Sequence, residues 1–494
     1  MSILTALQDP ALSISLILVF SGLLSYRWSG GLRGKTKNLP ADLGWASLTP
    51  ILEYVNRRED FIRYGLQRTK ESIWRFSFMS KTVIVLTGHA AREGFYKARS
   101  LDVKEGTFLL AFVPPIPGGA VDVSPADHST ILRRALAIQQ PDNMQKVLLP
   151  QWIEDSCRLM KEWGTSGRID PCDKVYEVFF YLILRTLTCV EVMEDRETCE
   201  KLRKLYDEMA FPTNVEGIYF SWFPGYNNVK RLLSTKRVYD IYYKVIKERK
   251  ASGVRKDDAL QLLLDNGDDR TITMGLMMGM VMAGSNSVGR IGIWLVSFLT
   301  TSSEWRQKIV TEIKDLIESS TGDSLSPKIP LAKQLTKLSL DDWENKTPVL
   351  DLVVAEMLRL AQPHAAVRRN LGPDFYIDGK LIPEKSYLVY PFSDIHHNSE
   401  VYPDPLEFRP GREIPSNVPY AHLGWGAGKN PCTGRRLAKM QLKIIATIFS
   451  LAYDPSIVDS EGSPMKLPNP DFNSIIGKPK EEFFIQYQPG EFTF

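Results

Sequence analysis

One cysteine in this chain lies where its neighbours suit metal chemistry. Cys432 belongs to the run LGWGAGKNPCTGRRLA, which covers residues 423–438 and joins a glycine-rich loop to a predicted helix. The apolar positions of that helix share one face and are Leu437, Met440, Ile444, Ile448 and Leu451. Free N–H groups and the dipole at a helix start stabilise a thiolate, and glycines leave room for a flat ligand. A thiolate in this position is suited to ligate iron.

Two other interpretations of the loop remain open. Gly424, Gly426 and Gly428 imitate a dinucleotide-binding loop, although a preceding strand and a βαβ setting are missing. Cys432 could also be a structural cysteine, which is the more frequent role of a lone buried thiol. The flanking glycines and the helix start favour a functional role.

The loop resembles the signature of the cytochrome P-450 superfamily, the heme-thiolate monooxygenases. That signature has an aromatic residue seven before the cysteine, a glycine four before it and a glycine two after it, and Trp425, Gly428 and Gly434 stand there. The family often has Arg or His two before the cysteine, where this chain has Asn430, which removes a charge that commonly contacts a heme propionate. The resemblance implies heme as the cofactor, with Cys432 as its axial ligand and metal ligand, and Trp425 and Gly428 beside it.

A second motif of the same family stands upstream in the expected order. Glu356 and Arg359 are three residues apart in VLDLVVAEMLRL and share one helix face, which resembles the Glu-x-x-Arg helix. The later run YPDPLEFRPGR resembles the segment whose arginine, here Arg412, completes a buried structural triad. The usual Glu before that arginine is Gly411 here. A surface ion pair is the alternative for Glu356 and Arg359.

The resemblance also implies cations for the two heme propionates. The candidates are Arg133 or Arg134 in a helix that lacks the family's tryptophan, and Arg368 or Arg369 in AVRR, with His128 as a further candidate. Each of them could instead be a solvated surface charge.

The predicted central helix departs from the family. Asn286 and Ser287 stand where the family usually has an acid and a threonine that deliver protons for dioxygen cleavage, and Gly284 still lets the helix open beside the heme. Serine keeps a hydroxyl, but asparagine cannot exchange a proton. Either Asn286 orients water and hydroxylation continues, or proton delivery is reduced because the substrate itself brings the oxygen.

The resemblance implies an enzyme that uses dioxygen and NADPH-derived electrons to hydroxylate or otherwise oxidise a lipophilic metabolite, such as a terpenoid, sterol or polyketide. Met277, Met280 and Met282, the 108–117 loop and residues 473–476 are expected to line its pocket. A separate reductase is implied, and its docking face could include Lys429, Arg435, Arg436 and Lys439, unless these form a solvated helix face. A heme-thiolate isomerase or dehydratase that needs no reductase, and a non-catalytic heme carrier, are the alternatives.

Composition agrees with a cytosol-facing globular body. The 61 basic and 58 acidic residues give a net charge of +3, which argues against a nucleic-acid binder. Five scattered cysteines fit a reducing compartment.

Membrane attachment is expected at the N-terminus. No residue between Asp9 and Arg27 is charged, and basic residues follow, so residues 1–37 are predicted to be a single-pass anchor in the endoplasmic reticulum rather than a cleaved signal peptide. The apolar run 271–289 carries several glycines and is predicted to be a buried central helix instead of a second span. Short strands are expected at 83–86, 375–377, 387–389 and 484–487, so the fold should be mainly α with minor β. The resemblance implies the cytochrome P-450 fold, as one heme-binding body over residues 38–494.

Overall fold

The computed structural model describes residues 38–43, 49–78, 81–107, 124–210, 225–362, 364–473 and 479–494. The predicted anchor, the 108–117 loop and residues 474–476 lie outside these ranges. Within the described ranges, no helix is both long enough and apolar enough to cross a membrane.

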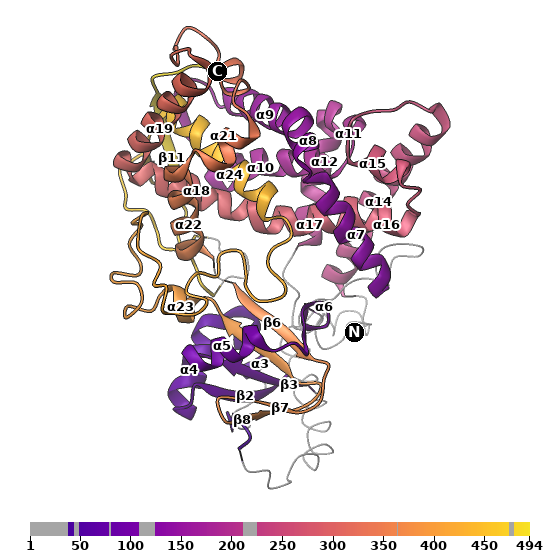
Figure 1. The fold of residues 1–494 in the computed structure, drawn as a ribbon, viewed down its shortest axis with the longest axis vertical. Helices are drawn as coiled ribbons and strands as arrows, with labels where there is room; N and C mark the ends of the chain where they lie inside the picture. Colours follow the sequence, from indigo (N-terminus) through magenta and orange to yellow (C-terminus); the bar gives the residue numbers. More distant parts are fainter. Residues whose placement is uncertain are drawn as a thin grey trace, which may run out of the picture.

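A six-stranded sheet forms the smaller part of the molecule, at the bottom of Figure 1. Its order is β1 (Ala41–Asp42), β2 (Ile73–Phe78), β3 (Lys81–Leu86), β9 (Tyr387–Pro391), β6 (Ala365–Asn370) and β4 (Leu101–Asp102). β3 and β9 are parallel with Val85 opposite Val389, and β6 runs antiparallel to β9 with Arg368 opposite Leu388. Helices α3 (Thr49–Asn56), α4 (Arg58–Thr69) and α5 (His89–Lys97) lie beside this sheet (Figure 1).

The two faces of this sheet have different partners because side chains alternate along a strand. Ala365 of β6 packs in a cluster with Tyr54 and Phe61 of α3 and α4. Its neighbour Ala366 packs in another cluster, with Phe95 of α5 and with Leu423, where the cysteine loop begins. One face of β6 therefore meets the cysteine loop.

Helices form the larger part, at the top of Figure 1. Its main helices are α7 (Pro125–Ile138), α9 (Leu149–Lys161), α10 (Pro171–Leu187), α12 (Arg196–Met209), α14 (Tyr226–Ser252), α19 (Ser303–Thr321), α22 (Pro348–Ala361) and α24 (Arg435–Ala452). Shorter helices are α6 (Val103–Thr107), α11 (Val190–Glu194), α15 (Ala259–Asp265), α20 (Leu331–Leu335), α21 (Leu340–Asn345) and α23 (Ser393–His396). Two small sheets complete the fold, one of β10 (Tyr453–Val458), β11 (Phe484–Pro489) and β5 (Gly167–Ile169), the other of β7 (Phe375–Ile377) and β8 (Lys380–Ile382).

The predicted central helix is present as one helical run inside this larger part. It consists of α16 (Arg270–Met274), a π-helical turn at Gly275–Met280, α17 (Val281–Gly284), a second π-helical turn at Ser285–Gly289, and α18 (Arg290–Thr301). Gly292 is buried against the Phe179 ring of α10, and a Cβ at that position would overlap the ring. Gly289 and Gly292 thus allow this helical run to approach α10 closely.

The mainly helical architecture with a smaller sheet component was predicted correctly. The strand predictions at 83–86, 375–377, 387–389 and 484–487 are also confirmed, as parts of β3, β7, β9 and β11. One pocket prediction is wrong: Met277 is fully buried in the main hydrophobic core, and its carbonyl accepts a hydrogen bond from Tyr206.

Candidate functional site

The cysteine loop is a turn closed by its own backbone. The Cys432 N–H donates to the Trp425 carbonyl at 2.8 Å, and the Gly426 N–H donates to the Leu423 carbonyl at 2.7 Å. Gly426 and Gly428 have φ angles of 71° and 70°, which an L side chain rarely adopts. The cysteine therefore lies at a fixed position, three residues before α24 begins at Arg435.

The protein around the loop sets the environment of the Cys432 thiol. Its surface is exposed, yet desolvation by the surrounding protein raises the pKa of its thiol, while the Gly434 backbone and the Arg435 charge act in the opposite direction. Both observations are explained if protein encloses the Cys432 side chain on most sides and leaves one side open to solvent. A thiol held in this way can face a flat ligand.

Gly428 brings the loop against the sheet side of the molecule. A Cβ at Gly428 would meet the Tyr96 carbonyl oxygen at 2.6 Å, so this position requires glycine on steric grounds as well as for its φ angle. Tyr96 and Phe95 of α5 pack edge to face at 5.0 Å, and the Arg368 guanidinium lies 5.7 Å from the Phe95 ring. Arg368 is thus on the same face of β6 as the cysteine loop.

The predicted triad residues meet in the structure. Arg359 is 1% exposed and donates two hydrogen bonds to the Glu356 carboxylate, at 2.8 and 2.9 Å. Arg412 donates to the same carboxylate at 2.9 Å and to the carbonyls of Asp404 and Glu407. These contacts join α22 to the segment before the cysteine loop.

Two histidines that the sequence did not single out connect this triad to the loop. Arg359 donates to the His396 carbonyl at 2.6 Å, and the His396 ring nitrogen Nε2 accepts from the Leu423 N–H at 2.8 Å. The His422 Nε2 lies 2.9 Å from the Ala355 carbonyl on α22. Burial lowers the pKa of both histidines, so both rings are neutral. Histidines without metal-ligand or catalytic spacing carry no sequence signal for this role.

A third contact reaches the loop from α7. Gln139, at the end of α7, donates from Nε2 to the Thr433 carbonyl at 2.9 Å, and Arg436 donates to the Gln139 carbonyl at 2.6 Å. The cysteine loop is therefore held from α22, α5 and α7.

The four candidate arginines have different surroundings. Arg134 makes a bidentate pair with Asp268 at 2.6 and 2.8 Å. Arg133 is exposed and donates to Thr130. Arg369 pairs with Glu105 at 2.9 Å. Arg368 makes no ion pair among the described residues and donates only to the neighbouring Val367 carbonyl. Desolvation lowers the pKa of Arg368, which agrees with its enclosed position. His128 is half-buried, and no described contact involves its ring.

The fit of these residues to a heme can be judged from their chemistry. The cysteine loop offers one exposed thiol, and no described atom lies within 4 Å of a Cβ at Gly434. On the same face of the sheet, Arg368 supplies a desolvated cation that forms no ion pair with a described residue. A flat, iron-containing group with carboxylates fits this combination.

The central helix presents one open face of small residues. Ser285, Gly289 and Gly292 are buried, and Gly289 and Gly292 face α10, whereas Ala283 and Ser287 on the opposite side are exposed. Ser287 Oγ donates to the Ala283 carbonyl at 2.7 Å and approaches the Gly284 carbonyl at 3.3 Å. A Cβ at Gly284 would meet Ile183 at 3.2 Å, so this glycine also serves helix packing.

Asn286 is fixed by an unusual partner. Its Nδ2 lies 3.0 Å from the sulfur of Met282, and its Oδ1 is buried with no hydrogen-bond partner. A side-chain amide in this position neither gains nor loses a proton.

The four cations of the predicted docking face are mostly engaged. Arg436 pairs with Glu344, and Lys439 pairs with Asp351 at 2.8 Å. Lys429 donates to the Arg99 carbonyl at 2.6 Å. Arg435 is exposed and makes no ion pair among the described residues. A depression of about 660 Å³ lies here, between α7, α21 and α24.

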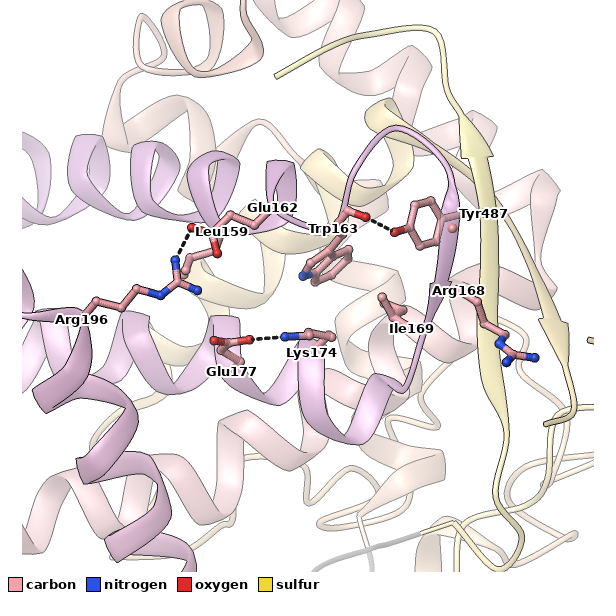
Figure 2. Close-up of a pocket in the computed structure, with 10 residues that line it drawn as sticks. Leu159, Glu162, Trp163, Arg168, Ile169, Lys174, Glu177, Arg196 and Tyr487 are labelled. Atoms are coloured by element: carbon pink, nitrogen blue, oxygen red, sulfur yellow. Dashed lines mark hydrogen bonds and ion pairs between the residues drawn. The ribbon is translucent and has the colours of Figure 1, made fainter.

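Another depression, of about 440 Å³, lies elsewhere in the helical part of the molecule. It lies between α9, α10, α12 and β11, and Figure 2 shows ion pairs on its wall beside apolar and aromatic residues. Glu162 accepts from Arg196 at 2.7 Å, and Lys174 donates to Glu177 at 3.2 Å. Since Cys432 and the central helix contribute nothing to its lining, we do not assign it to the reaction.

The family comparison covers most of the chain. The family model described as Cytochrome P-450 matches residues 50–486. The cytochrome P-450 monooxygenase dmxR5 of Cryptosporiopsis sp. (strain 8999) is 28% identical over 405 residues, which cover 79% of this chain and 78% of that protein. The obtusifoliol 14-alpha demethylase of Sorghum bicolor is 23% identical over 504 residues, with 97% of this chain and 95% of that protein covered.

A solved structure agrees at the level of the fold. The retinoic acid bound cyanobacterial CYP120A1 superposes with a TM-score of 0.70 and 19% sequence identity, covering 92% of this chain and 99% of that chain.

Proposed function

Since this chain belongs to the cytochrome P-450 family of heme-thiolate enzymes, we propose that it is a monooxygenase that oxidises a lipophilic metabolite in a biosynthetic pathway. The observation that carries this proposal is the Cys432 loop, whose first residue is bonded to His396 and through it to the Arg359–Glu356 pair. A loop that is held so firmly suits a metal ligand whose position must not vary.

We assign the heme contacts residue by residue. Cys432 is the axial ligand, and Trp425 and Gly428 shape the loop beside it. Arg368 holds a propionate, because it forms no ion pair with any residue that the structure describes. Arg133, Arg134 and Arg369 are weaker candidates, because two of them already pair with acids and the third is exposed. When bound, thiolate-ligated heme supplies the dioxygen chemistry that inserts one oxygen atom into a substrate.

The proposed substrate class draws on the names of relatives and on the expected pocket. Relatives of this chain include monooxygenases of Cryptosporiopsis and Aspergillus novofumigatus and a demethylase named for obtusifoliol. A sterol-like compound agrees with the name of the demethylase, and a terpenoid, sterol or polyketide-like compound suits the half-buried Met280 and Met282 on the central helix.

Electrons and membrane attachment complete the proposal. Residues 38–494 form the catalytic body, and residues 1–37 anchor it in the endoplasmic reticulum with the body facing the cytosol. A separate NADPH-dependent reductase delivers electrons at the face around Arg435, which is exposed beside the cysteine loop.

One observation favours a second candidate, an isomerase or dehydratase of an oxygenated substrate. Asn286 holds the position of the family's acid, and its Oδ1 has no partner, so this side chain cannot hand on a proton. An enzyme whose substrate already carries the oxygen needs no such proton delivery.

Spectroscopy of the full-length protein tests the proposal. Reduced membranes with carbon monoxide should show the Soret band of a thiolate-ligated heme, and Cys432→Ala should abolish it. A spectrum that is unchanged in Cys432→Ala overturns the heme assignment. Product formed from a peroxide substrate without NADPH would decide for the second candidate.

A further inference from the structure

A depression of about 660 Å³ lies beside the cysteine loop, between α7, α21 and α24. Its volume is within the range of about 300–1,000 Å³ that small-molecule sites usually have. Thr433, the residue after Cys432, is part of its wall. The complete lining is Leu136, Gln139, Gln140, Trp343, Glu344, Asn345, Thr433, Arg435, Arg436, Lys439, Met440 and Lys443.

Positive charge dominates this lining. Four of the twelve lining residues are basic and one, Glu344, is acidic. Glu344 is already held by Arg436, and Asp351, which lies outside the lining, is shared by the two lysines. Arg435 is exposed and makes no ion pair among the described residues. The cations therefore outnumber the acids, and the Arg435 guanidinium is available to a negatively charged ligand.

The depression also offers apolar contact and neutral polar groups. Met440 and Trp343 are almost fully buried and close it from below, whereas Leu136 of α7 exposes 47% of its surface. The side chains of Gln140 and Asn345 are exposed at its rim. Ligand sites commonly combine an apolar surface with a few polar groups that fix the orientation of the ligand. An anion with an apolar, flat body suits this combination.

The depression of about 440 Å³ lacks such an available charge. Its acids and cations pair with each other, as Figure 2 shows. Its remaining cation, Arg168, donates to the Ser460 carbonyl at 2.7 Å. A charged ligand would have to break existing pairs there, whereas it would find Arg435 unpaired in the depression beside the cysteine loop.

Short contacts connect the depression beside the loop to Cys432. Arg435 begins α24 three residues after Cys432. Arg436 donates to the Gln139 carbonyl at 2.6 Å, and Gln139 Nε2 donates to the Thr433 carbonyl at 2.9 Å. A ligand in this depression therefore lies against the contacts that hold the loop. It would also cover the face at which the reductase is proposed to deliver electrons.

We propose that this depression binds an aromatic organic anion, which regulates electron delivery by covering the reductase face. The Arg435 guanidinium donates charge-assisted hydrogen bonds to the anionic group, and the aromatic body packs against Leu136. The class includes aryl sulfonates, aryl carboxylates and nucleoside phosphates. The regulatory part of this inference rests on the proposed function, whereas the binding part does not.

Calorimetry with the holoenzyme at pH 7.5 tests the binding part. The probes are naphthalene-2-sulfonate, 2-naphthoate and adenosine 5′-phosphate. Their neutral analogues are naphthalene-2-sulfonamide, 2-naphthamide and adenosine. We expect at least one anion to bind about ten-fold or more tightly than its neutral analogue, because charge-assisted hydrogen bonds are the stronger ones. Equal binding within all three pairs overturns the site.

Substitutions on two elements locate the bound anion. Arg435→Gln should remove most of the preference for the anion, and Arg435→Lys should keep most of it. Leu136→Glu places a negative charge at the rim and should weaken anion binding, whereas the neutral Leu136→Gln should not. Arg237→Gln is the control, because Arg237 is exposed on α14 and does not line the depression. A preference that survives both Arg435→Gln and Leu136→Glu overturns this location.

Reduction kinetics test the regulatory part. The anion that binds most tightly, at a saturating concentration, should slow reduction of the holoenzyme by an NADPH-dependent reductase several-fold. Reduction by the small reductant 5-deazaflavin, reduced by light, should stay unchanged. Equal rates with and without the anion, or equal slowing of both reactions, overturn the regulatory role. An enzyme that binds the anion but oxidises no lipophilic substrate would overturn the proposed function and leave the binding site intact.

Discussion

The His396 Nε2 accepts a 2.8 Å hydrogen bond from the Leu423 N–H while the His396 carbonyl accepts from Arg359. One residue thus ties the start of the cysteine loop to the buried Glu356–Arg359 pair. Because His396 is fully buried, water cannot take its place, and only another buried group at the same position could accept the hydrogen bond from the Leu423 N–H.

We expect His396→Ala to leave the Leu423 N–H without an acceptor and to open a cavity. An unsatisfied buried donor costs about 1–3 kcal/mol, so heme content and the thermal midpoint should both fall. The control is His89→Ala, because His89 is exposed at the start of α5. Equal heme content in the two variants would contradict the role of His396.

Disruption of the buried Glu356–Arg359 pair should destabilise the fold more than the loss of the His396 ring. Glu356→Gln leaves the Arg359 and Arg412 guanidiniums beside a neutral group, and breaking a buried pair costs about 3–5 kcal/mol. We expect urea unfolding at a much lower midpoint and little bound heme. Arg409→Ala is the control, because its side chain is half exposed and only its backbone N–H contacts Glu356. If both variants unfolded at the wild-type midpoint, the triad would not support the fold.

Acid should weaken the fold through histidines that are neutral when folded. Burial lowers the pKa of His397 to about 4, while the unfolded chain takes up this proton near pH 6.5. The unfolded state therefore binds more protons between these values, and stability falls as the pH drops from about 6.5 towards 4.

A variant isolates that contribution. His397→Gln removes the titrating group, so its stability should depend less on pH than that of the wild type, by about 1–2 kcal/mol between pH 7 and pH 5. Chemical unfolding at both pH values measures the difference. Parallel curves for the two proteins would show that His397 is not the source of the acid sensitivity.

Local motifs were readable from the sequence, whereas partners distant in sequence were not. The loop around Cys432 and the spacing of Glu356 and Arg359 depend on neighbours within one turn of helix, and the chain shows both directly. Arg134 looked equivalent to Arg368, but it pairs with Asp268, which is 134 residues away. No pattern in the sequence indicates that contact.

The sequence also did not indicate which residues at the end of a helix are buried. Arg57 and Arg58 are adjacent arginines, yet one is exposed and the other lies in the core beside Tyr54. The start of α4 decides which of them points inward, and helix boundaries are read from sequence only to within a residue or two. The sequence did not predict strand β6, because Arg368 and Arg369 interrupt its apolar pattern. In the structure the two arginines lie on opposite faces of the sheet, Arg368 over the Phe95 ring and Arg369 over the Tyr387 ring.

The open face of the central helix supports a prediction about Ser287. Its hydroxyl is exposed and donates to the Ala283 carbonyl at 2.7 Å, which leaves its oxygen lone pairs free to accept from water. Since Asn286 cannot exchange protons, Ser287 supplies the hydroxyl where the sequence predicts the family's proton relay. We expect Ser287→Ala to lower the product formed per NADPH consumed several-fold, with heme content unchanged.

The matched control is Ser297→Ala on the same helical run. Ser297 Oγ makes the same bond, to the Ile293 carbonyl at 2.7 Å, but the residue is fully buried and away from the open face. Product and NADPH consumption, measured together in the reconstituted enzyme, distinguish the two serines. Because the bond to the helix backbone is lost in both variants, a fall in yield confined to Ser287→Ala can come only from the hydroxyl on the open face. An equal effect of both substitutions would mean that helix geometry, rather than proton delivery, sets the yield.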